Sequence, residues 1–584
     1  MNCPRCQAPA LEGAAFCEAC GVRLERGCPS CGAEAGPAAR FCRNCGSPLQ
    51  AEDRAPAAFT PSHLATKILA SRASLEGERK QVTALFADLR GSMELLESVD
   101  PEEARRLMDP AVQLMMDAVH RYEGTVNHVL GDGVMALFGA PIAHEDAPRR
   151  ALYAALAIRD SISRYGEQVR REKGAVIQVR VGVNSGEVVV RSIGSDLRLD
   201  YSAVGHAVGL AARMESLANP NTVLVTGDTY ALTEDYFRWS ALGPIAVKGS
   251  SQPVEAYELL GASDVRTRLQ AGARRGLTPF IGRSREMDHL KENLELAKRG
   301  HGQVVGVVGD PGVGKSRLFL ELKGLDRTGG CLILEASSVS FGKATAYLPL
   351  IYVLRGYFRI DAEDGPDAVR EKVIGRLLAL DESLRDTVPR FLDLLTEGDE
   401  QVAAEDADHR RRLRTDAVKR LFFRESARQP LVIIFEDLHW VDGDTLALLG
   451  ALIEGLPTSR VLLLTNYRPE FSSPWAARGY FSLLRLDPLE EESAEELLSA
   501  LLGPDAALME LRSLLLQRAG GNPFFTEELV RSLVDRGALA GHPGAYQPAG
   551  DISRLELPPT VQGVLAGAST GWSRTPSARY RPPL

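Results

Sequence analysis

The sequence has little cysteine beyond its first 45 residues, no excess of basic residues and no long apolar run. Eight of its nine cysteines lie before residue 46, and Cys331 stands alone. The net charge of −9 argues against a general nucleic-acid coat. No stretch approaches the roughly 20 apolar residues that span a bilayer, and the first residues lack the apolar core of a signal peptide. We therefore expect a cytoplasmic protein that has no membrane partner and for which a nucleic-acid partner is disfavoured.

The chain is too long for a single domain. At 584 residues it exceeds the size at which one hydrophobic core stops growing, so several domains are expected. Its 45% hydrophobic and 25% charged residues are typical of globular proteins.

Residues 1–50 repeat one cysteine pattern, Cys-x2-Cys-x10-Cys-x2-Cys, twice. In a reducing cytosol, clustered cysteines are more often metal ligands than disulfides. Each copy supplies four thiolates for tetrahedral Zn²⁺, and the short segment between the pairs leaves the metal to supply the folding energy. The pattern resembles the double zinc ribbon family and predicts two closed, structural zinc sites. Their ligands are Cys3, Cys6, Cys17 and Cys20 in the first copy, and Cys28, Cys31, Cys42 and Cys45 in the second. Whether the ribbons bind a protein or a nucleic acid stays open.

Residues 51–78 are predicted to be an Ala/Pro-rich linker that continues into a helix. Ser62 is a plausible helix cap after Pro61. A signalling or dimerisation helix and a simple spacer fit this stretch equally well.

Two acidic residues, Asp88 and Asp132, follow apolar runs in residues 79–260. Asp88 comes after residues 82–87, and Asp132 lies in a Gly-Asp-Gly turn between two apolar stretches. Carboxylates at the end of a strand and in a tight hairpin suit divalent ions, because Mg²⁺ prefers carboxylate, water and phosphate oxygens. Two ions that share two acids activate one oxygen and hold a triphosphate.

The surrounding pattern predicts mixed helices and strands. A strand at 82–87, a helical region through about Tyr122, a hairpin around Asp132, a helix at roughly 145–172 and an alternating strand at 176–183 follow one another. This order favours an α+β layer with the acids at one end of the sheet.

Four motifs in this region resemble class III adenylyl and guanylyl cyclase domains. They are residues 86–92, residues 131–139, residues 200–205 with 210–213, and the turn at 247–249. The resemblance implies a ferredoxin-like fold that forms a head-to-tail homodimer. It also implies attack of the ribose 3′-oxygen of ATP or GTP on the α-phosphate, with release of pyrophosphate.

The resemblance assigns roles to individual residues. Asp88 and Asp132 would hold two Mg²⁺ or Mn²⁺ ions, with help from the backbone carbonyl of Leu89. Arg213 would neutralise charge on the reacting phosphate, and Lys248 would contact the terminal phosphates. Such catalysis depends on positioning and charge neutralisation.

Three positions depart from the family pattern. His128 stands where cyclases usually carry a base-reading Lys, Ser202 stands where they carry Asp or Thr, and Gly209 replaces an Asn that positions the transition state. Losing such a donor commonly costs a factor of about 10²–10³ in rate. A second hypothesis is therefore a degenerate cyclase domain, kept for nucleotide binding or dimerisation beside a working ATPase.

Residues 279–540 contain a second nucleotide-binding pattern. A buried-type strand at 304–308 runs into a glycine-rich GxxxxGKS loop and then a helix, so this segment predicts a phosphate site. Lys315 would reach the β- and γ-phosphates of ATP, and Ser316 would bind Mg²⁺. The backbone of the loop, which includes Gly309, Gly312 and Gly314, would cradle the phosphates.

Two further strands complete this prediction. Residues 431–435 lead into Glu436 and Asp437, of which one would contact Mg²⁺ through water and the other would orient a hydrolytic water. The strand from Val461 is followed by Arg468, a candidate sensor of the γ-phosphate, for which a solvated loop arginine is the alternative.

Four segments of this region resemble the signal-transduction ATPases of the AAA+-related group. They are residues 280–283, the phosphate motifs, residues 437–442 and residues 520–524. The resemblance implies an α/β P-loop core with a small helical lid that acts as a slow ATP-dependent switch. It also places Arg283 near the nucleotide and Pro523 beside the adenine.

The expected organisation is thus a multidomain chain with two connecting segments. Residues 261–278 are predicted to link the two nucleotide domains, and residues 541–584 are predicted to be a truncated or disordered tail, with a frameshift as one hypothesis. The leading functional hypothesis is a signalling nucleotide cyclase governed by an ATP-binding and ATP-hydrolysing switch. Its effector, an unknown protein or ligand, would act through the zinc ribbons or the C-terminal region.

Overall fold

The structure is a computed structural model of the full chain. It describes residues 79–90, 100–144, 146–193, 200–204, 206–247, 252–263, 265, 267–325, 328–338, 342, 346–361, 364–396 and 405–549. The zinc-ribbon cysteines, the helix expected in 62–70, Lys248 and residues 550–584 lie outside these ranges. Among the described helices, none is both long enough and apolar enough to cross a membrane.

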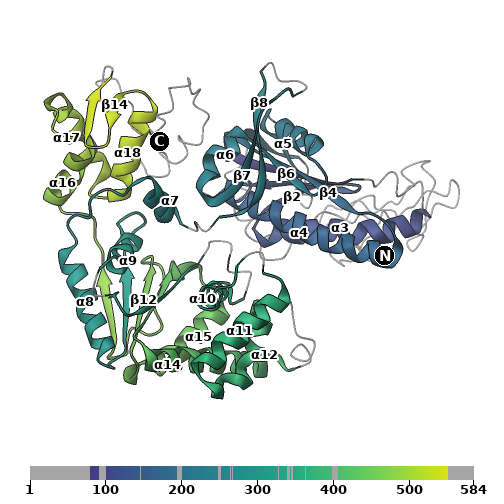
Figure 1. The fold of residues 1–584 in the computed structure, drawn as a ribbon. Coiled ribbons are helices and arrows are strands. Elements are labelled where there is room, and N and C mark those ends of the chain that lie inside the picture. The colour runs from purple at the N-terminus through teal and green to yellow at the C-terminus, as the bar shows by residue number, and fades with distance from the viewer. Residues whose placement is uncertain are drawn as a thin grey trace, which may run out of the picture. The chain divides into compact units, whose positions relative to one another are not determined.

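Residues 79–262 build a mixed domain around one sheet (Figure 1). Its first half has the order strand, helix, two strands, helix, strand: β1 (Arg79–Arg90), α3 (Pro101–Arg121), β2 (Thr125–Leu130), β3 (Gly133–Phe138), α4 (Ala147–Lys173) and β4 (Gln178–Ile193). These strands lie antiparallel in the order β2-β3-β1-β4, the ferredoxin-like arrangement that the resemblance to cyclase domains implies. Figure 1 shows α3 and α4 running side by side.

The second half extends the same sheet. It contains β5 (Asp200–Val204), α5 (His206–Leu217), β6 (Thr222–Thr226), α6 (Gly227–Thr233), β7 (Phe237–Ile245) and β8 (Val254–Ala262). Strand β6 pairs parallel with β4, and β8 and β7 follow antiparallel. The sheet therefore continues past β4 in the order β6-β8-β7.

Alternation along β4 places successive residues on the two opposite faces of the sheet. Val179, Val181 and Val183 are fully buried, whereas Arg180 and Gly182 point to the opposite face, where α5 lies. A Cβ on Gly182 would fall 2.0 Å from the Glu215 nitrogen of α5. The helix thus packs directly on the strand backbone, and only glycine permits this approach.

One strand boundary differs from the prediction. Strand β1 does not end before Asp88 but continues to Arg90, because Asp88 pairs with Gly133 on one side and Arg180 on the other. Hydrogen bonding on both edges extends the strand beyond its apolar run. Asp88 therefore lies within the sheet rather than in a loop.

Residues 303–485 form a second domain with a parallel five-stranded sheet. The strands are β9 (Gln303–Val308), β10 (Leu332–Ser337), β11 (Leu431–Glu436), β12 (Val461–Tyr467) and β13 (Phe481–Arg485). Their order is β10-β11-β12-β9-β13, and β11 and β12 are buried throughout. Buried apolar strands of this kind are typical of sheets covered on both faces by helices.

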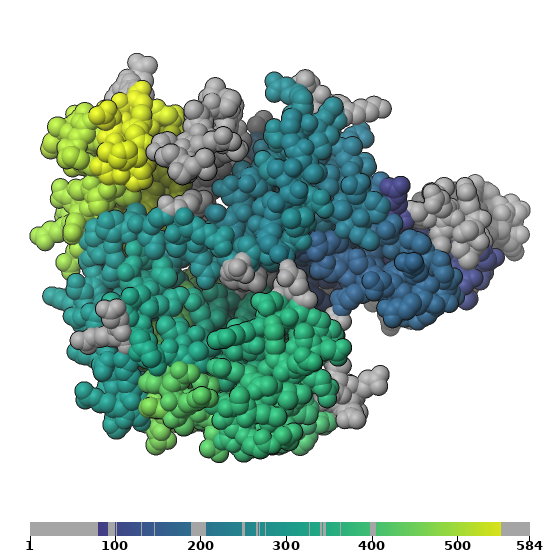
Figure 2. Space-filling view, in the orientation of Figure 1, coloured from purple at the N-terminus to yellow at the C-terminus, as the bar shows by residue number. Residues whose placement is uncertain are grey.

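Helices surround this parallel sheet. They are α8 (Ser284–Lys298), α9 (Lys315–Lys323), α10 (Leu348–Phe358), α11 (Pro366–Leu380), α12 (Val388–Leu395), α14 (Ala407–Arg428) and α15 (Gly443–Glu454). Helices α10, α11, α12 and α14 form an insertion between β10 and β11 that shares its apolar core with the sheet. Figure 2 shows the surface of this part of the chain in green, as the bar gives it by residue number. The sequence pattern did not predict this helical insertion.

A helical lid follows the parallel sheet. It contains α16 (Glu491–Leu502), α17 (Met509–Ala519), α18 (Pro523–Asp535) and a hairpin of β14 (Leu539–His542) and β15 (Ala545–Pro548). The predicted tail from residue 541 is therefore wrong for 541–548. Tyr546 is buried in the apolar core of the lid, and the Gly544 nitrogen donates to the Leu501 carbonyl over 2.8 Å. The predicted linker 261–278 likewise contains a helix, α7 (Arg268–Arg275), which Thr267 caps.

The contact between Gly182 and α5 yields a test of the first domain. Gly182→Ala should destabilise β4 and α5 by about 1–3 kcal/mol, as overpacking commonly does. Gly209→Ala is the matched control, because no atom lies within 4 Å of a Cβ at that exposed helical position. Amide hydrogen exchange in residues 178–193 and 206–217 of the full chain should accelerate only in Gly182→Ala. Equal protection in both variants would contradict the packing.

Candidate functional sites

The first site is formed where β1 meets the turn between β2 and β3. Asp88 pairs with Gly133, and the Leu89 nitrogen donates to the Asp132 carbonyl over 3.3 Å. A Cβ on Gly133 would lie 2.9 Å from both Asp88 Oδ1 and the Ala87 carbonyl. Glycine at 133 therefore lets the turn that carries Asp132 approach Asp88.

The two carboxylates repel each other. Burial raises the pKa of Asp88, the charge of Asp132 raises it further, and the Arg180 guanidinium opposes both effects. A pair of neighbouring carboxylates is a donor set that suits hard divalent cations. Within the described part of the chain, no group of three or more His, Cys, Asp or Glu side chains could hold a metal ion. A metal at this pair would therefore take its remaining oxygens from phosphate, water or the backbone.

Arg180 is a site residue that the sequence analysis missed. Its Nη2 lies 3.0 Å from Asp88 Oδ2 and 2.9 Å from Glu215 Oε1. The available indication was an arginine flanked by Val179 and Val181 in the alternating strand 176–183. A cation there lies beside the acids, on the face of the sheet that α5 covers.

The structure places the other predicted residues of this domain on different elements. His128 is exposed on β2, and Arg213 and Gly209 are exposed on α5. Ser202 lies in β5, and Lys248 lies outside the described residues. The described chain thus brings together Asp88, Leu89 and Asp132, and leaves His128 and Arg213 on its surface.

The second site is the loop between β9 and α9. Gly312 and Gly314 have φ of +84° and +102°, values that favour glycine. Lys315 is the first residue of α9 and is buried, and its Nζ donates to the carbonyls of Gly309 (2.7 Å) and Asp310 (2.8 Å). Burial lowers the pKa of Lys315. The loop and the start of α9 present backbone N–H groups and a positive helix end, which suit phosphate.

The predicted acids lie at the end of the neighbouring strand β11. Burial raises the pKa of Glu436 to about 7, although hydrogen bonds from Ser316 and Asn466 oppose the shift. Burial also raises the pKa of Asp437, and the charge of Lys315 opposes that rise. Arg468 lies with its guanidinium 5.3 Å from the centre of the Trp440 ring. The structure thus gathers Lys315, Ser316 and both acids at one edge of the sheet.

Asn466 is the site residue missed here. It is fully buried at the end of β12, and its Nδ2 donates to Glu436 Oε2 over 3.1 Å. Its Oδ1 accepts from the Asp437 nitrogen over 2.7 Å. The amide therefore fixes both acids. A polar residue in the apolar strand 461–467 was the available indication.

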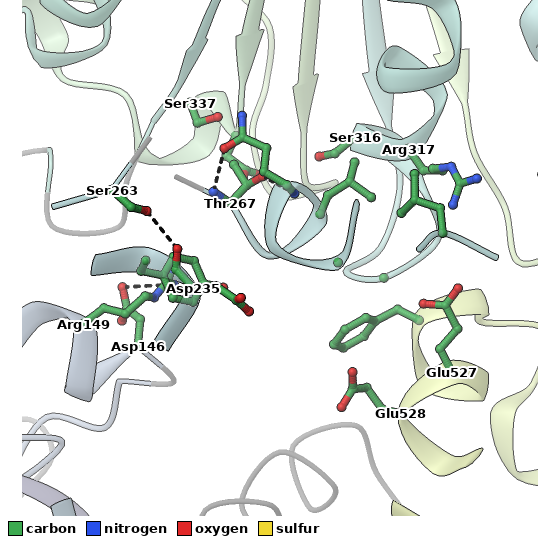
Figure 3. Close-up of a pocket in the computed structure, with 18 of the residues that line it drawn as sticks. Asp146, Arg149, Asp235, Ser263, Thr267, Ser316, Arg317, Ser337, Glu527 and Glu528 are labelled. Atoms are coloured by element: carbon green, nitrogen blue, oxygen red, sulfur yellow. Dashed lines mark hydrogen bonds and ion pairs between the residues drawn. The ribbon is translucent and has the colours of Figure 1, made fainter. Parts of the chain in front are cut away.

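The lid touches the phosphate loop directly. Asn522 caps α18 and donates from Nδ2 to the Pro311 carbonyl over 2.9 Å, and the Phe524 nitrogen donates to the Gly312 carbonyl over 3.3 Å. Pro523, the residue predicted beside adenine, is the first residue of α18 and lies between these two contacts. Figure 3 shows Ser316 and Arg317 at the start of α9, with Glu527 and Glu528 on α18.

Known families match these segments in the order in which they occur. Residues 76–261 match the adenylate and guanylate cyclase catalytic domain, residues 279–464 match the AAA ATPase domain, and residues 3–46 match the double zinc ribbon. Residues 490–542, the lid, match a domain of unknown function. The chain is therefore a multidomain protein that joins a double zinc ribbon, a nucleotide cyclase catalytic domain and an AAA ATPase domain.

Individual relatives resemble the chain over different extents. An uncharacterised protein of Rhizobium meliloti is 29% identical over 465 residues, which is 78% of this chain and 44% of the relative. Adenylate cyclase 1 of the same organism is 29% identical over 196 residues, 33% of this chain and 30% of the relative. The adenylyl cyclase CyaB from P. aeruginosa is 32% identical over 33% of this chain and all of that structure, with a TM-score of 0.32. The chain spans less than half the length of the two curated relatives.

The raised pKa of Glu436 predicts a dependence of stability on pH. Because the folded pKa of about 7 exceeds the ordinary 4.5, the folded state binds the proton more tightly, and stability falls as pH rises from about 4.5 to about 7. Without nucleotide or metal at pH 8, Glu436→Gln should stabilise the ATPase domain by up to about 3 kcal/mol.

Thermal unfolding at pH 8 and pH 5 measures this effect. The gain in stability of Glu436→Gln over the wild type should be smaller at pH 5 than at pH 8. The control Glu454→Gln, at an exposed position on α15, should show no gain at either pH. An advantage of the same size at both pH values would mean that charge is not its cause.

Proposed function

We propose that the chain forms a cyclic nucleotide from ATP or GTP, and that its AAA ATPase domain acts as an ATP-dependent switch on this output. The observation that carries the proposal is the pair Asp88 and Asp132, held together by Gly133 beside the cation Arg180. The match of residues 76–261 to the cyclase catalytic domain supports the reaction class. The match of residues 279–464 supports the switch.

In this proposal Asp88, Asp132 and the Leu89 carbonyl hold two Mg²⁺ or Mn²⁺ ions. When bound, these ions supply charge neutralisation and a more acidic ribose 3′-hydroxyl. Arg180, whose guanidinium bridges Asp88 and Glu215, would contact phosphate oxygens once Asp88 turns to a cation. The 3′-oxygen then attacks the α-phosphorus, its proton leaves to solvent, and pyrophosphate departs.

The exposed residues of α5 and β2 fit a second role. Arg213 and His128 are open to solvent in one chain, so they are available to a second copy. We infer that a head-to-tail homodimer places them over the acids of the partner, with Arg213 neutralising the reacting phosphate. His128 and Ser202 would contact the base, and Lys248 the terminal phosphates.

The ATPase half of the proposal assigns the second site. The loop from Gly309 to Gly314 cradles the phosphates of ATP, and Lys315 exchanges its two loop carbonyls for the β- and γ-phosphates. Ser316 and Glu436, which share a hydrogen bond, would hold Mg²⁺, with Glu436 acting through water. Asp437, oriented by Asn466, positions the hydrolytic water, and Arg468 senses the γ-phosphate.

A product assay tests the cyclase half. The full chain, incubated with ATP or GTP and Mg²⁺ or Mn²⁺, should release cyclic nucleotide and pyrophosphate in equal amounts. Asp88→Asn, which removes a metal ligand at unchanged size, should lower the rate at least about 10²-fold. Asp117→Asn, exposed on α3, should retain the rate. No product with either nucleotide and either metal would refute cyclase activity.

Gly209 favours a second candidate, a cyclase domain kept for nucleotide binding or dimerisation. The position lacks the family's asparagine, yet nothing lies within 4 Å of a Cβ there, so an asparagine fits without strain. If the domain is catalytically silent, Gly209→Asn combined with His128→Lys should create activity in a chain that had none. If it is active, the same pair should raise an existing rate, by up to about 10²–10³-fold.

A further inference from the structure

Residues 278–283 are the last residues of the segment that connects the cyclase domain to the ATPase domain. We call them the linker clamp. They follow α7 and precede α8. The side chains and backbone of the clamp contact both the P-loop core and the helical lid.

Thr278 forms hydrogen bonds with both the P-loop core and the helical lid. Its hydroxyl donates to Glu527 on α18 of the lid, and its carbonyl accepts from Arg317 Nη2 on α9 over 2.7 Å. Figure 3 shows Arg317 and Glu527 on these two elements. Arg317 is itself held by Glu321, with an Nε to Oε1 distance of 2.7 Å. The side chain of Thr278 is thus hydrogen-bonded to the lid, and its backbone carbonyl is hydrogen-bonded to α9.

The next residues continue this division. Phe280 packs against the apolar core that α8 and α9 share with the sheet, and the Arg317 guanidinium lies 5.9 Å from its ring centre. Ile281 packs against the apolar core of the lid. Gly282, at φ +71°, lies so close to the lid that a Cβ would come within 2.6 Å of Ser493 Oγ.

Arg283 closes the clamp at the phosphate loop. Its buried guanidinium donates from Nη2 to the Val313 carbonyl over 3.2 Å and to the Asp487 carbonyl over 2.6 Å. Val313 belongs to the phosphate loop, and Asp487 lies between β13 and the first lid helix. The clamp therefore connects the phosphate loop to the segment that leads from β13 into the lid.

We propose that the linker clamp transmits the nucleotide state of the ATPase domain to the connector, and through it to the cyclase domain. The phosphate loop and α18 already share the contacts Asn522–Pro311 and Phe524–Gly312, so phosphate binding acts on the lid. When α18 moves relative to α9, Thr278 cannot keep both of its bonds. The connector then stays bound to the P-loop core or to the lid and loses its bond to the other, which gives it two discrete positions.

The inference rests on the proposed binding of ATP to residues 279–464. Its test therefore measures binding and transmission separately in the full chain. A fluorescent ATP analogue reports binding at the P-loop, with Lys315→Ala as the variant that removes it. Hydrogen exchange of the connector, residues 265–283, with ATP or with ADP reports transmission without any need for cyclase activity.

Three variants isolate the Thr278 bond. Thr278→Val removes the hydroxyl at similar size, Glu527→Ala removes its acceptor, and Thr278→Ser keeps the hydroxyl as a conservative rescue. The control is Glu528→Ala, on the same helix, whose carboxylate accepts from Arg531 Nη1 over 2.6 Å. All four variants should bind the ATP analogue within about threefold of the wild type, a difference below 1 kcal/mol.

The expected result is a difference in connector exchange between ATP and ADP of about fivefold or more in the wild type, at the lower end of common allosteric couplings. Thr278→Val and Glu527→Ala should lose most of this difference, while Thr278→Ser and Glu528→Ala keep it. An undiminished difference in the first two variants, or no difference in a wild type that binds ATP, would overturn the clamp. Absence of ATP binding would refute the proposed switch itself, and the clamp with it.

Discussion

The close approach of two like charges, Asp88 and Asp132, is the constraint around which the cyclase domain is arranged. Neighbouring carboxylates repel, and burial of Asp88 adds to the cost of its charge. The fold holds the pair together because β1 is hydrogen-bonded on both edges and because residue 133 has no side chain. The repulsion is partly relieved by Arg180, which is itself held by Glu215. Binding of divalent cations would relieve the remaining repulsion. The same two negative charges that repel each other in the protein are therefore the ones that would attract the metal ions of the proposed reaction.

The ATPase domain also brings two acids together in a buried place, and it holds them there by hydrogen bonds. Glu436 and Asp437 are adjacent acids, and Asn466 contacts the carboxylate of one and the backbone nitrogen of the other. The cation Lys315 lies close enough to oppose the pKa shift of Asp437. The same loop that would bind phosphate also holds the lid through its carbonyls. Nucleotide chemistry and lid position are therefore linked through the same backbone, and the linker clamp extends this link toward the cyclase domain.

Local motifs predicted much of this organisation, and long-range contacts explain the remainder. The Gly-Asp-Gly turn and the GxxxxGKS loop are short patterns whose chemistry is local, so Asp132, Lys315 and Ser316 could be proposed as site residues from the sequence. Arg180 and Asn466 were missed because their importance comes from pairing with residues 92 and 30 positions away. Residues 541–548 of the lid hairpin were assigned to a tail because their few apolar residues show no period of their own, and burial of Tyr546 in the lid reveals their role. The end of β1 was placed too early because an acid interrupts its apolar pattern, although the strand continues.

Direct counting of metal ions tests the central claim, that Asp88 and Asp132 form a two-metal nucleotide site. Mn²⁺ titration followed by electron paramagnetic resonance suits this purpose, using zinc-loaded full chain in a Lys315→Ala background and a 3′-deoxy nucleoside triphosphate that cannot cyclise. The account predicts two nucleotide-dependent Mn²⁺ ions per cyclase domain, lost on Asp88→Asn and retained on Asp117→Asn. Equal Mn²⁺ binding by the Asp88→Asn chain and its parent would contradict it.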